Sequence, residues 1–135
     1  MSEAILNKAA CFAALPPEWP EDLLPGIRSL VRASGKKIVV LDDDPTGTQT
    51  VHGLPVLTVW SVQTLRKTLL ADDPAFFILT NSRSLSTQAA CTLALEIGEN
   101  LNKAADLAGI SVDIISRSDS TLRGHFPQEV DALAK

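Results

Sequence analysis

The sequence lacks the features that mark several classes of protein. Its 12 Lys and Arg residues are outnumbered by 16 Asp and Glu, for a net charge of -4, whereas binding to nucleic acid phosphates requires clustered cations. It contains two cysteines, Cys11 and Cys91, whose wide separation predicts buried thiols in a reducing compartment and no metal site. No apolar run approaches the ~20 residues that cross a bilayer. We therefore expect a cytoplasmic protein that binds neither nucleic acid nor membrane.

Motifs of nucleotide binding and of hydrolytic catalysis are missing as well. The chain has neither a GxxxxGK phosphate loop nor a GxGxxG fingerprint, and it has no nucleophile elbow. Its two histidines, His52 and His125, lack the spacing of metal ligands. We interpret His52 as a turn residue, whereas His125 shares a loop with Arg123 and stays open as a ligand contact.

The chain divides into two parts that differ in pattern. Residues 1–35 predict a helical N-terminal extension, with helices over 2–15 and about 21–33 that the prolines of PPEWPED separate. From residue 36 onward, apolar strand-like runs alternate with amphipathic helical stretches. This alternation predicts an α/β fold with an open, mainly parallel sheet and helices on both faces. The expected strands cover 37–41, 55–60, 75–80 and 111–116, and the expected helices cover 61–70, 86–107 and a stretch that begins at Pro127.

The last predicted helix suggests that the α/β domain is incomplete. Its sequence, PQEVDALAK, reaches Lys135 without a glycine, asparagine or proline that would end it. A sheet of about four strands that stopped here would also keep an apolar edge unpaired. We expect residues 36–135 to be the front part of a domain that further chain completes.

Three polar segments each follow a predicted strand. DDDPTGTQT follows KIVVL, NSRS follows AFFILT, and RSDSTLRGH follows SVDIIS. Because the carboxyl ends of parallel strands lie along one edge of a sheet, these segments should meet there in a binding site. Carboxylates accept hydrogen bonds from hydroxyls or hold Mg²⁺, and guanidiniums bind carboxylates and phosphates bidentately. A small polyhydroxylated acid or a phosphorylated sugar suits such a site, whose charged residues are Asp42, Asp43, Asp44, Asp119, Arg83, Arg117 and Arg123.

One interpretation of this site starts from the acidic triplet alone. Residues 42–46 fit the DxDxT pattern of haloacid dehalogenase-type phosphatases, with Asp42 as nucleophile, Asp44 as general acid and base, and Mg²⁺ bridging them to the phosphate. Thr80-Asn81 resembles the second motif of that superfamily. This interpretation gives RSDSTLRGH no role. A further alternative is a sugar-acid-binding fragment without catalysis.

A different interpretation accounts for all three segments. Asp43, Asp44, Thr46 and Gly47 form an Asp-Asp-x-Thr-Gly stretch, residues 119–124 read Asp-Ser-Thr-Leu-Arg-Gly, and Ser82-Arg83-Ser84 follows the middle strand. With these motifs the chain resembles the four-carbon acid sugar kinase family, in its sugar-binding N-terminal domain. The resemblance spans about residues 36 to 130, and the DSTLRG block is its most specific part.

The resemblance implies an ATP-dependent kinase that phosphorylates a terminal hydroxyl of an acid sugar such as a tetronate. In the family this domain holds the sugar acid, while a separate C-terminal domain holds ATP, with which Mg²⁺ arrives. That second domain is absent from the 135 residues, so we expect this stretch alone to be inactive. The expected partners are a small sugar acid and ATP, and assembly into a homo-oligomer is an open alternative.

The resemblance also implies roles for individual residues. Arg83 and Arg123 would hold the sugar carboxylate, and Asp43, Asp44 and Asp119 would hold hydroxyls. Arg117 would contact the substrate or the transferring phosphate. Either Asp119 or Asp43 would accept the proton of the attacking hydroxyl, and no residue is assigned to a metal. The implied substrate-binding residues are Asp43, Asp44, Thr46, Gly47, Ser82, Arg83, Arg117, Asp119, Ser120, Thr121, Arg123 and Gly124.

Overall fold

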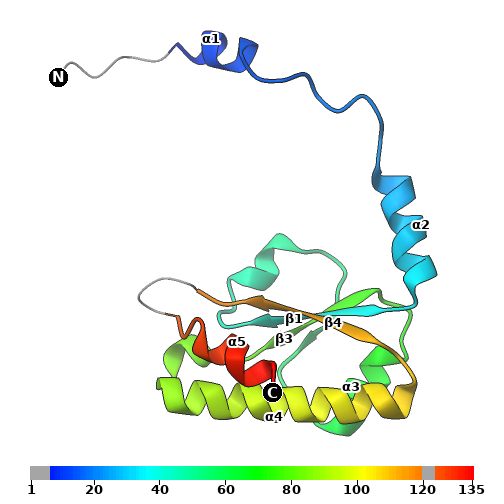
Figure 1. Cartoon of the computed structure of the whole chain (residues 1–135), viewed down its shortest axis with the longest axis vertical. Coiled ribbons are helices and arrows are strands. Elements are labelled where there is room, and N and C mark those ends of the chain that lie inside the picture. The colour runs from blue at the N-terminus through cyan, green and yellow to red at the C-terminus, as the bar shows by residue number, and fades with distance from the viewer. Residues whose placement is uncertain (1–6, 120–123) are drawn as a thin grey trace, which may run out of the picture.

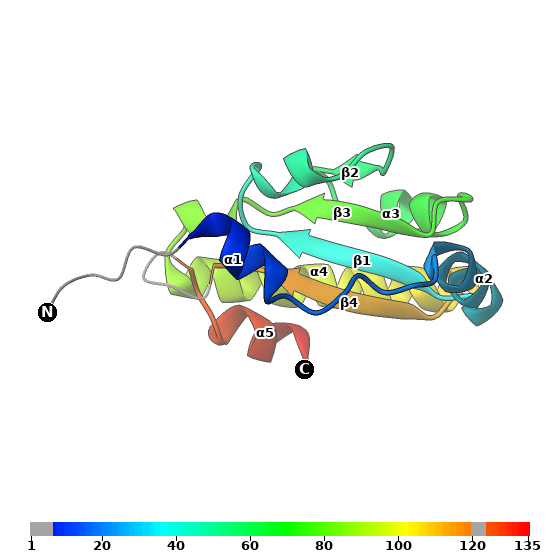
Figure 2. The ribbon, with the colours of Figure 1, turned by 90° about the horizontal axis from the view of Figure 1, so that it is seen from above.

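The structure, a computed structural model, describes residues 7–119 and 124–135 and contains one parallel sheet. Its strands lie in the order β2-β3-β1-β4 (Figure 2), and every neighbouring pair is parallel. The predicted α/β class with an open parallel sheet is confirmed. The elements are α1 (Lys8–Ala13), α2 (Leu24–Ser34), β1 (Lys37–Asp42), the 3-10 turn η1 (Gly47–Thr50), β2 (Val56–Leu57), α3 (Val62–Leu69), β3 (Ala75–Leu79), the 3-10 turn η2 (Ser82–Ser84), α4 (Thr87–Ala108), β4 (Val112–Arg117) and α5 (Gln128–Leu133).

Strand β2 is shorter than the sequence predicts, whereas β1, β3 and β4 lie within a residue of their predicted positions. In the apolar run over 55–60, the strand register with β3 covers Val56 and Leu57, and the Pro55 carbonyl accepts a hydrogen bond from the Phe77 N–H. Beyond them the chain turns toward α4. There Trp60 Nε1 donates a hydrogen bond to Glu96 Oε1, and the Trp60 carbonyl accepts one from Asn100 Nδ2. These contacts with α4 explain why the residues after Leu57 leave the sheet, although their apolar pattern alone predicts a strand.

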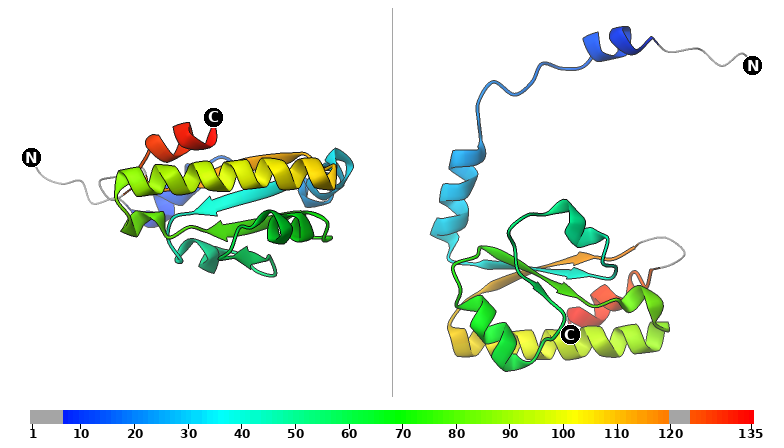
Figure 3. Two further views of the ribbon diagram at one scale, coloured as in Figure 1. Left: turned by 90° about the horizontal axis from the view of Figure 1, so that it is seen from below. Right: turned by 180° about the vertical axis from the view of Figure 1, so that it is seen from behind.

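Helices α3 and α4 pack on one face of the sheet (Figures 1 and 3). They begin after Ser61 and Ser86, whose side chains accept hydrogen bonds from backbone N–H groups three residues further on. On the opposite side lies the loop that contains η1 (Figure 1). The sequence predicts helices on both faces, but within the described residues the packed helices cover one. The core between sheet and helices contains Val39, Leu41, Phe76, Ile78, Leu65, Leu69, Ile97 and Leu101.

The N-terminal segment, residues 7–35, extends away from the sheet (Figures 1 and 3). Neither α1 nor α2 contains a buried residue, and large apolar side chains such as Phe12, Trp19 and Leu30 are exposed. Cys11 is exposed as well, so its predicted burial is wrong, because the rest of the described chain buries no residue of α1. Among the described residues, no helix combines the length and the apolar content that crossing a bilayer requires.

Candidate functional site

The carboxyl ends of β1, β3 and β4 bring the three polar segments together. In the parallel register, Asp42 lies opposite Leu79 of β3 and opposite Arg117 of β4. The residues that follow these strands therefore start side by side. The N–H and the hydroxyl of Thr80 both donate to the carbonyl of Asp42, at 2.9 and 3.0 Å. Parallel pairing thus places residues 42–44, 80–84 and 117–119 at one edge of the sheet.

Arg83 joins η2 to the acidic triplet through three hydrogen bonds. Its Nε and Nη2 donate to Asp43 Oδ2 and Oδ1 at 3.1 and 2.9 Å, and its Nη1 donates to Asp44 Oδ2 at 3.0 Å. The side chain of Asp43 is 2% exposed. Its hydrogen bonds to Arg83 raise the pKa of that guanidinium above its ordinary value. The bidentate geometry fixes the orientation of both partners, so Arg83 and Asp43 form a rigid base for the site.

Asp42 is a buried carboxylate with a different partner. Its Oδ1 accepts a hydrogen bond from Arg117 Nη1 at 3.2 Å, while its Oδ2 has no hydrogen-bond partner among the described residues. Burial raises the pKa of Asp42, and the charge of Arg117 opposes that rise. Gly47 packs directly on this pair, because a Cβ at that position would overlap both the Asp42 carboxylate and the Arg117 guanidinium.

The burial of Asp42 bears on the phosphatase interpretation. A nucleophilic aspartate must reach the phosphorus atom of its substrate and share a metal ion with it. Asp42 is 0% exposed and is covered by Gly47 and Arg117, so its oxygens do not face solvent. The geometry of Asp42 is that of a structural carboxylate beneath the site, which argues against attack on a phosphate ester.

An open hollow of about 330 Å³ lies over the buried pairs, lined by Arg83, Arg117, Ser118 and Asp119. The Asp119 N–H donates to Asp43 Oδ2 at 3.1 Å, which ties the segment after β4 to the acidic triplet. Arg117 is 44% exposed, so its charge reaches the hollow. The volume and the mixed charges suit a small polar ligand.

Several predicted contact residues support the site from within. Ser82 is buried, and its hydroxyl is 3.1 Å from that of Thr80, so its side chain contacts the protein interior and is not exposed to a ligand. Thr46 donates to Asp44 Oδ1 through its backbone N–H, at 2.7 Å, and through its hydroxyl. A Cβ on Gly124 would overlap the carbonyl oxygen of Asp119. The other predicted contacts, Ser120, Thr121 and Arg123, lie outside the described residues.

The sequence analysis gave three residues near the site no role in sugar-acid binding, and it did not decide whether His125 contacts a ligand. Ser118 belongs to the polar segment after β4 but matches no motif, and Thr80, predicted as the end of a strand and matched only to the phosphatase motif, had no role in the sugar-acid interpretation. Glu129 of α5 is buried, and its signal is positional, because it shares a helix face with the buried Ala132 and half-buried Leu133. His125 places Nε2 3.2 Å from the carbonyl oxygen of Ser82 and Nδ1 3.2 Å from Thr87 Oγ1. It therefore connects the segment before α5 to η2 and the start of α4.

The acidic residues at this edge of the sheet are not arranged to hold a metal ion. Within residues 7–119 and 124–135, no group of three or more acidic, histidine or cysteine side chains is arranged to hold a metal. The carboxylates of Asp42 and Asp43 are directed at guanidiniums instead. A Mg²⁺ site built from these aspartates would require both ion pairs to open.

Comparison with known proteins places the chain in a family. A family model described as a sugar-binding N-terminal domain matches residues 38–135. This is the domain of four-carbon acid sugar kinases, and the chain belongs to that family, so the resemblance expected from the three motifs is confirmed. Neither a curated protein nor a solved structure matches the chain. The domain has a sugar-binding role, and its partner is a small-molecule sugar.

Proposed function

We propose that this chain is the substrate-binding part of an ATP-dependent kinase that phosphorylates a terminal hydroxyl of a four-carbon acid sugar of the tetronate type. The observation that carries the proposal is the hollow over the paired aspartates and arginines, which offers cations and a carboxylate on one surface. A neutral sugar would need only hydroxyl-binding groups. The arginines therefore favour a substrate that carries an acid group.

In this proposal the exposed and the buried charges have different tasks. Arg117, which is 44% exposed and lines the hollow, binds the substrate carboxylate together with Arg123. Arg83 is committed to Asp43 and Asp44 and contributes mainly positive potential. Asp119 lines the hollow and accepts the proton of the attacking hydroxyl. Asp43 is buried and accepts three hydrogen bonds, so we assign it a positioning role.

The reaction proposed is phosphoryl transfer to the hydroxyl that Asp119 orients. A bond forms between that oxygen and the γ-phosphorus of ATP, the bond to the β-phosphate oxygen breaks, and ADP leaves. ATP and Mg²⁺ supply the phosphoryl group and neutralise its charge, and they would be bound by a separate domain. The contribution of this chain is orientation of the acceptor, which accounts for a large share of catalysis in such reactions.

Calorimetric titration of the 135-residue chain with four-carbon sugar acids tests the binding half of the proposal. The matched ligand is erythritol, which has the hydroxyls but no carboxylate. Sugar acids should bind at least about tenfold more tightly than erythritol, because one charge-assisted bidentate contact is worth about 1.5–3 kcal/mol. Equal or absent binding of the two ligands would contradict the proposal.

Two variants then test the assigned residues. Arg117→Lys keeps the charge but loses the planar fork, and Asp119→Asn keeps the shape but loses the carboxylate. Each should weaken sugar-acid binding by about tenfold. Lys36→Met is the control, because Lys36 pairs with Asp113 at the opposite end of the sheet and its loss should leave the affinity unchanged. Turnover with ATP, measured on a polypeptide that also contains the second domain, should fall further in Asp119→Asn than binding does.

A further inference from the structure

Glu129 is a buried carboxylate outside every predicted motif. It lies in the first turn of α5, is 6% exposed, and its Oε2 has no hydrogen-bond partner among the described residues. An unpaired buried carboxylate oxygen costs about 1–3 kcal/mol or more. Such a residue in the interior therefore calls for a specific partner or a specific role.

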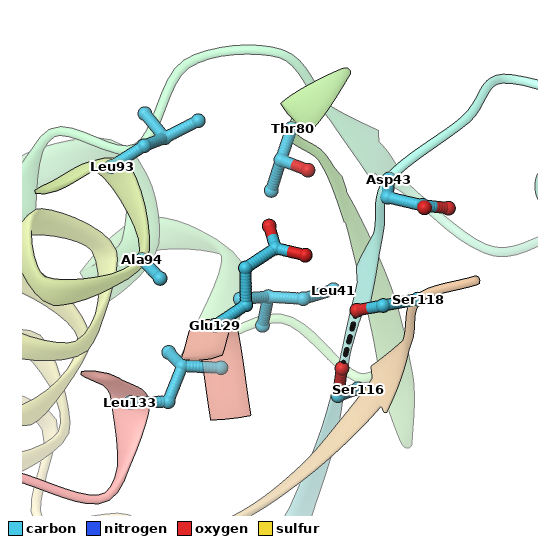
Figure 4. Close-up of a pocket in the computed structure, with 9 residues that line it drawn as sticks. All are labelled: Leu41, Asp43, Thr80, Leu93, Ala94, Ser116, Ser118, Glu129 and Leu133. Carbon is cyan, nitrogen blue, oxygen red and sulfur yellow. Dashed lines mark hydrogen bonds between the residues drawn. The ribbon is translucent and has the colours of Figure 1, made fainter. Parts of the chain in front are cut away.

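The carboxylate of Glu129 points into a small internal cavity behind the site (Figure 4). On one side the cavity is lined by aliphatic side chains of β1, α4 and α5, and on the other by polar groups. The polar lining consists of Asp43, Thr80, Ser116 and Ser118. The cavity volume is about 10 Å³, which is room for about one water molecule. Water occupies cavities of this size when several polar groups line them.

The polar residues around this cavity are the ones that hold the candidate site in place. Thr80 donates its hydroxyl to the Asp42 carbonyl at 3.0 Å. Ser118 Oγ lies 2.6 Å from Ser116 Oγ, and the next residue, Asp119, donates its N–H to Asp43 Oδ2 at 3.1 Å. A group in the cavity that hydrogen bonds to Thr80 and Ser118 therefore also restrains the two segments that contain Asp43 and Asp119.

We propose that Glu129 is a positioning residue, which acts through a single water molecule bound in this cavity between its carboxylate and the hydroxyls of Thr80 and Ser118. The water donates one hydrogen bond to Glu129 Oε2, and its other hydrogen and its lone pairs bond to the hydroxyl side of the cavity. Helix α5 is thereby connected to the segment after β4. The effect of Glu129 on ligand affinity rests on the sugar-acid function proposed above. Its effect on the order of the residues around the cavity does not depend on that function.

The test compares Glu129→Leu with Glu129→Gln. Leucine fills the cavity with an apolar group, whereas glutamine keeps the shape and hydrogen bonds with water. Asp131→Asn is the matched control, because Asp131 is an exposed acid on the same helix. Amide hydrogen exchange by NMR is read at Asp119 and Thr80, with the buried Phe76 of β3 as internal reference. This measurement requires no ligand.

Glu129→Leu should speed exchange of the Asp119 amide by about tenfold, the equivalent of about one lost hydrogen bond, without a change at Phe76. Glu129→Gln and Asp131→Asn should stay close to wild type. Wild type and Glu129→Gln should also show magnetisation transfer from a long-lived water to amides around the cavity, and Glu129→Leu should not. Unchanged exchange at Asp119 in Glu129→Leu, or no long-lived water in wild type, would overturn the proposal.

Two further measurements keep the result interpretable. If Glu129→Leu does not fold, Ser118→Ala provides the test, because it removes a hydroxyl on the opposite side of the cavity. This variant should speed exchange of the Asp119 amide severalfold, and an unchanged exchange rate would also overturn the proposal.

Calorimetry on the same variants should show about tenfold weaker sugar-acid binding in Glu129→Leu. If wild type binds no sugar acid, the proposed function fails, and the exchange data alone decide the role of Glu129.

Discussion

The two ends of the parallel sheet carry ion pairs of opposite kinds. At the carboxyl end, Asp43 is 2% exposed and held bidentately by Arg83. Near the amino end, Lys36 pairs with Asp113 of β4 at 3.0 Å, but their side chains are 49% and 57% exposed. Both pairs join segments far apart in sequence. They differ in how much water each charge has lost.

The exposed fraction of a paired side chain distinguishes surface charges, which keep the protein soluble, from buried charges, which position a binding site. An exposed pair gains little, because water and salt screen it. A buried pair loses hydration energy that its own attraction barely replaces, so folding alone gives little reason to keep one. The two buried aspartates, Asp42 and Asp43, lie where the polar segments meet. This distribution supports the proposal that the carboxyl end binds a charged ligand.

The largest expected effect comes from removing one acid at each end of the sheet. Asp43→Ala deletes the acceptor of three hydrogen bonds and should lower the free energy of unfolding by about 3 kcal/mol. Asp113→Ala removes half of an exposed pair and should change it by less than about 0.5 kcal/mol. Urea unfolding at neutral pH measures both. Equal losses in the two variants would remove the distinction between the two ends.

A smaller effect is expected from pH, through Asp42. Burial raises the pKa of Asp42 above its ordinary value of 3.8, so the folded chain binds a proton there at pH values at which the unfolded chain does not. The wild type should therefore lose stability relative to Asp42→Asn as the pH rises from 3.8 through the raised pKa. Above that pKa the difference should be constant.

Urea unfolding of both proteins between about pH 4 and pH 7 checks this sign. The difference between their free energies of unfolding isolates Asp42, because asparagine does not titrate. A difference that did not vary with pH, or that favoured the wild type at high pH, would show that Asp42 is ionised at little cost. The contrast between a desolvated end and a hydrated end would then be smaller than the burial suggests.

The sequence contained enough information to predict the meeting of Asp43 and Arg83. Both follow apolar runs that form neighbouring parallel strands, and the geometry of such a sheet brings their carboxyl ends together. The family motif added Asp119, whose N–H contacts Asp43. These predictions depend on periodicity and order along the chain, which a single sequence displays.

What the sequence did not predict depends on contacts across the layers. The apolar run at 55–60 looks like a strand until α4 supplies hydrogen bonds to Trp60. Three consecutive aspartates look equivalent, yet Gly47 covers Asp42 while Asp44 stays partly exposed. Glu129 becomes part of the site only because α5 packs on α4 beside the carboxyl ends of the strands. Such distinctions follow from packing in three dimensions, not from local pattern.

The smallest expected effect is the coupling energy between Lys36 and Asp113, the exposed ion pair near the amino end of the sheet. A double-mutant cycle with Lys36→Ala and Asp113→Ala should give a coupling energy of about 0.5 kcal/mol or less. In 1 M salt, where the screening length is about 3 Å, most of it should disappear. The same cycle on Arg83 and Asp43 should give a larger coupling that salt changes little, because the Asp43 side chain is only 2% exposed to the solvent and its ions. A salt-insensitive coupling at Lys36 and Asp113 would mean that exposure does not control the strength of these pairs. The buried carboxylates would then lose their value as a marker of the ligand site.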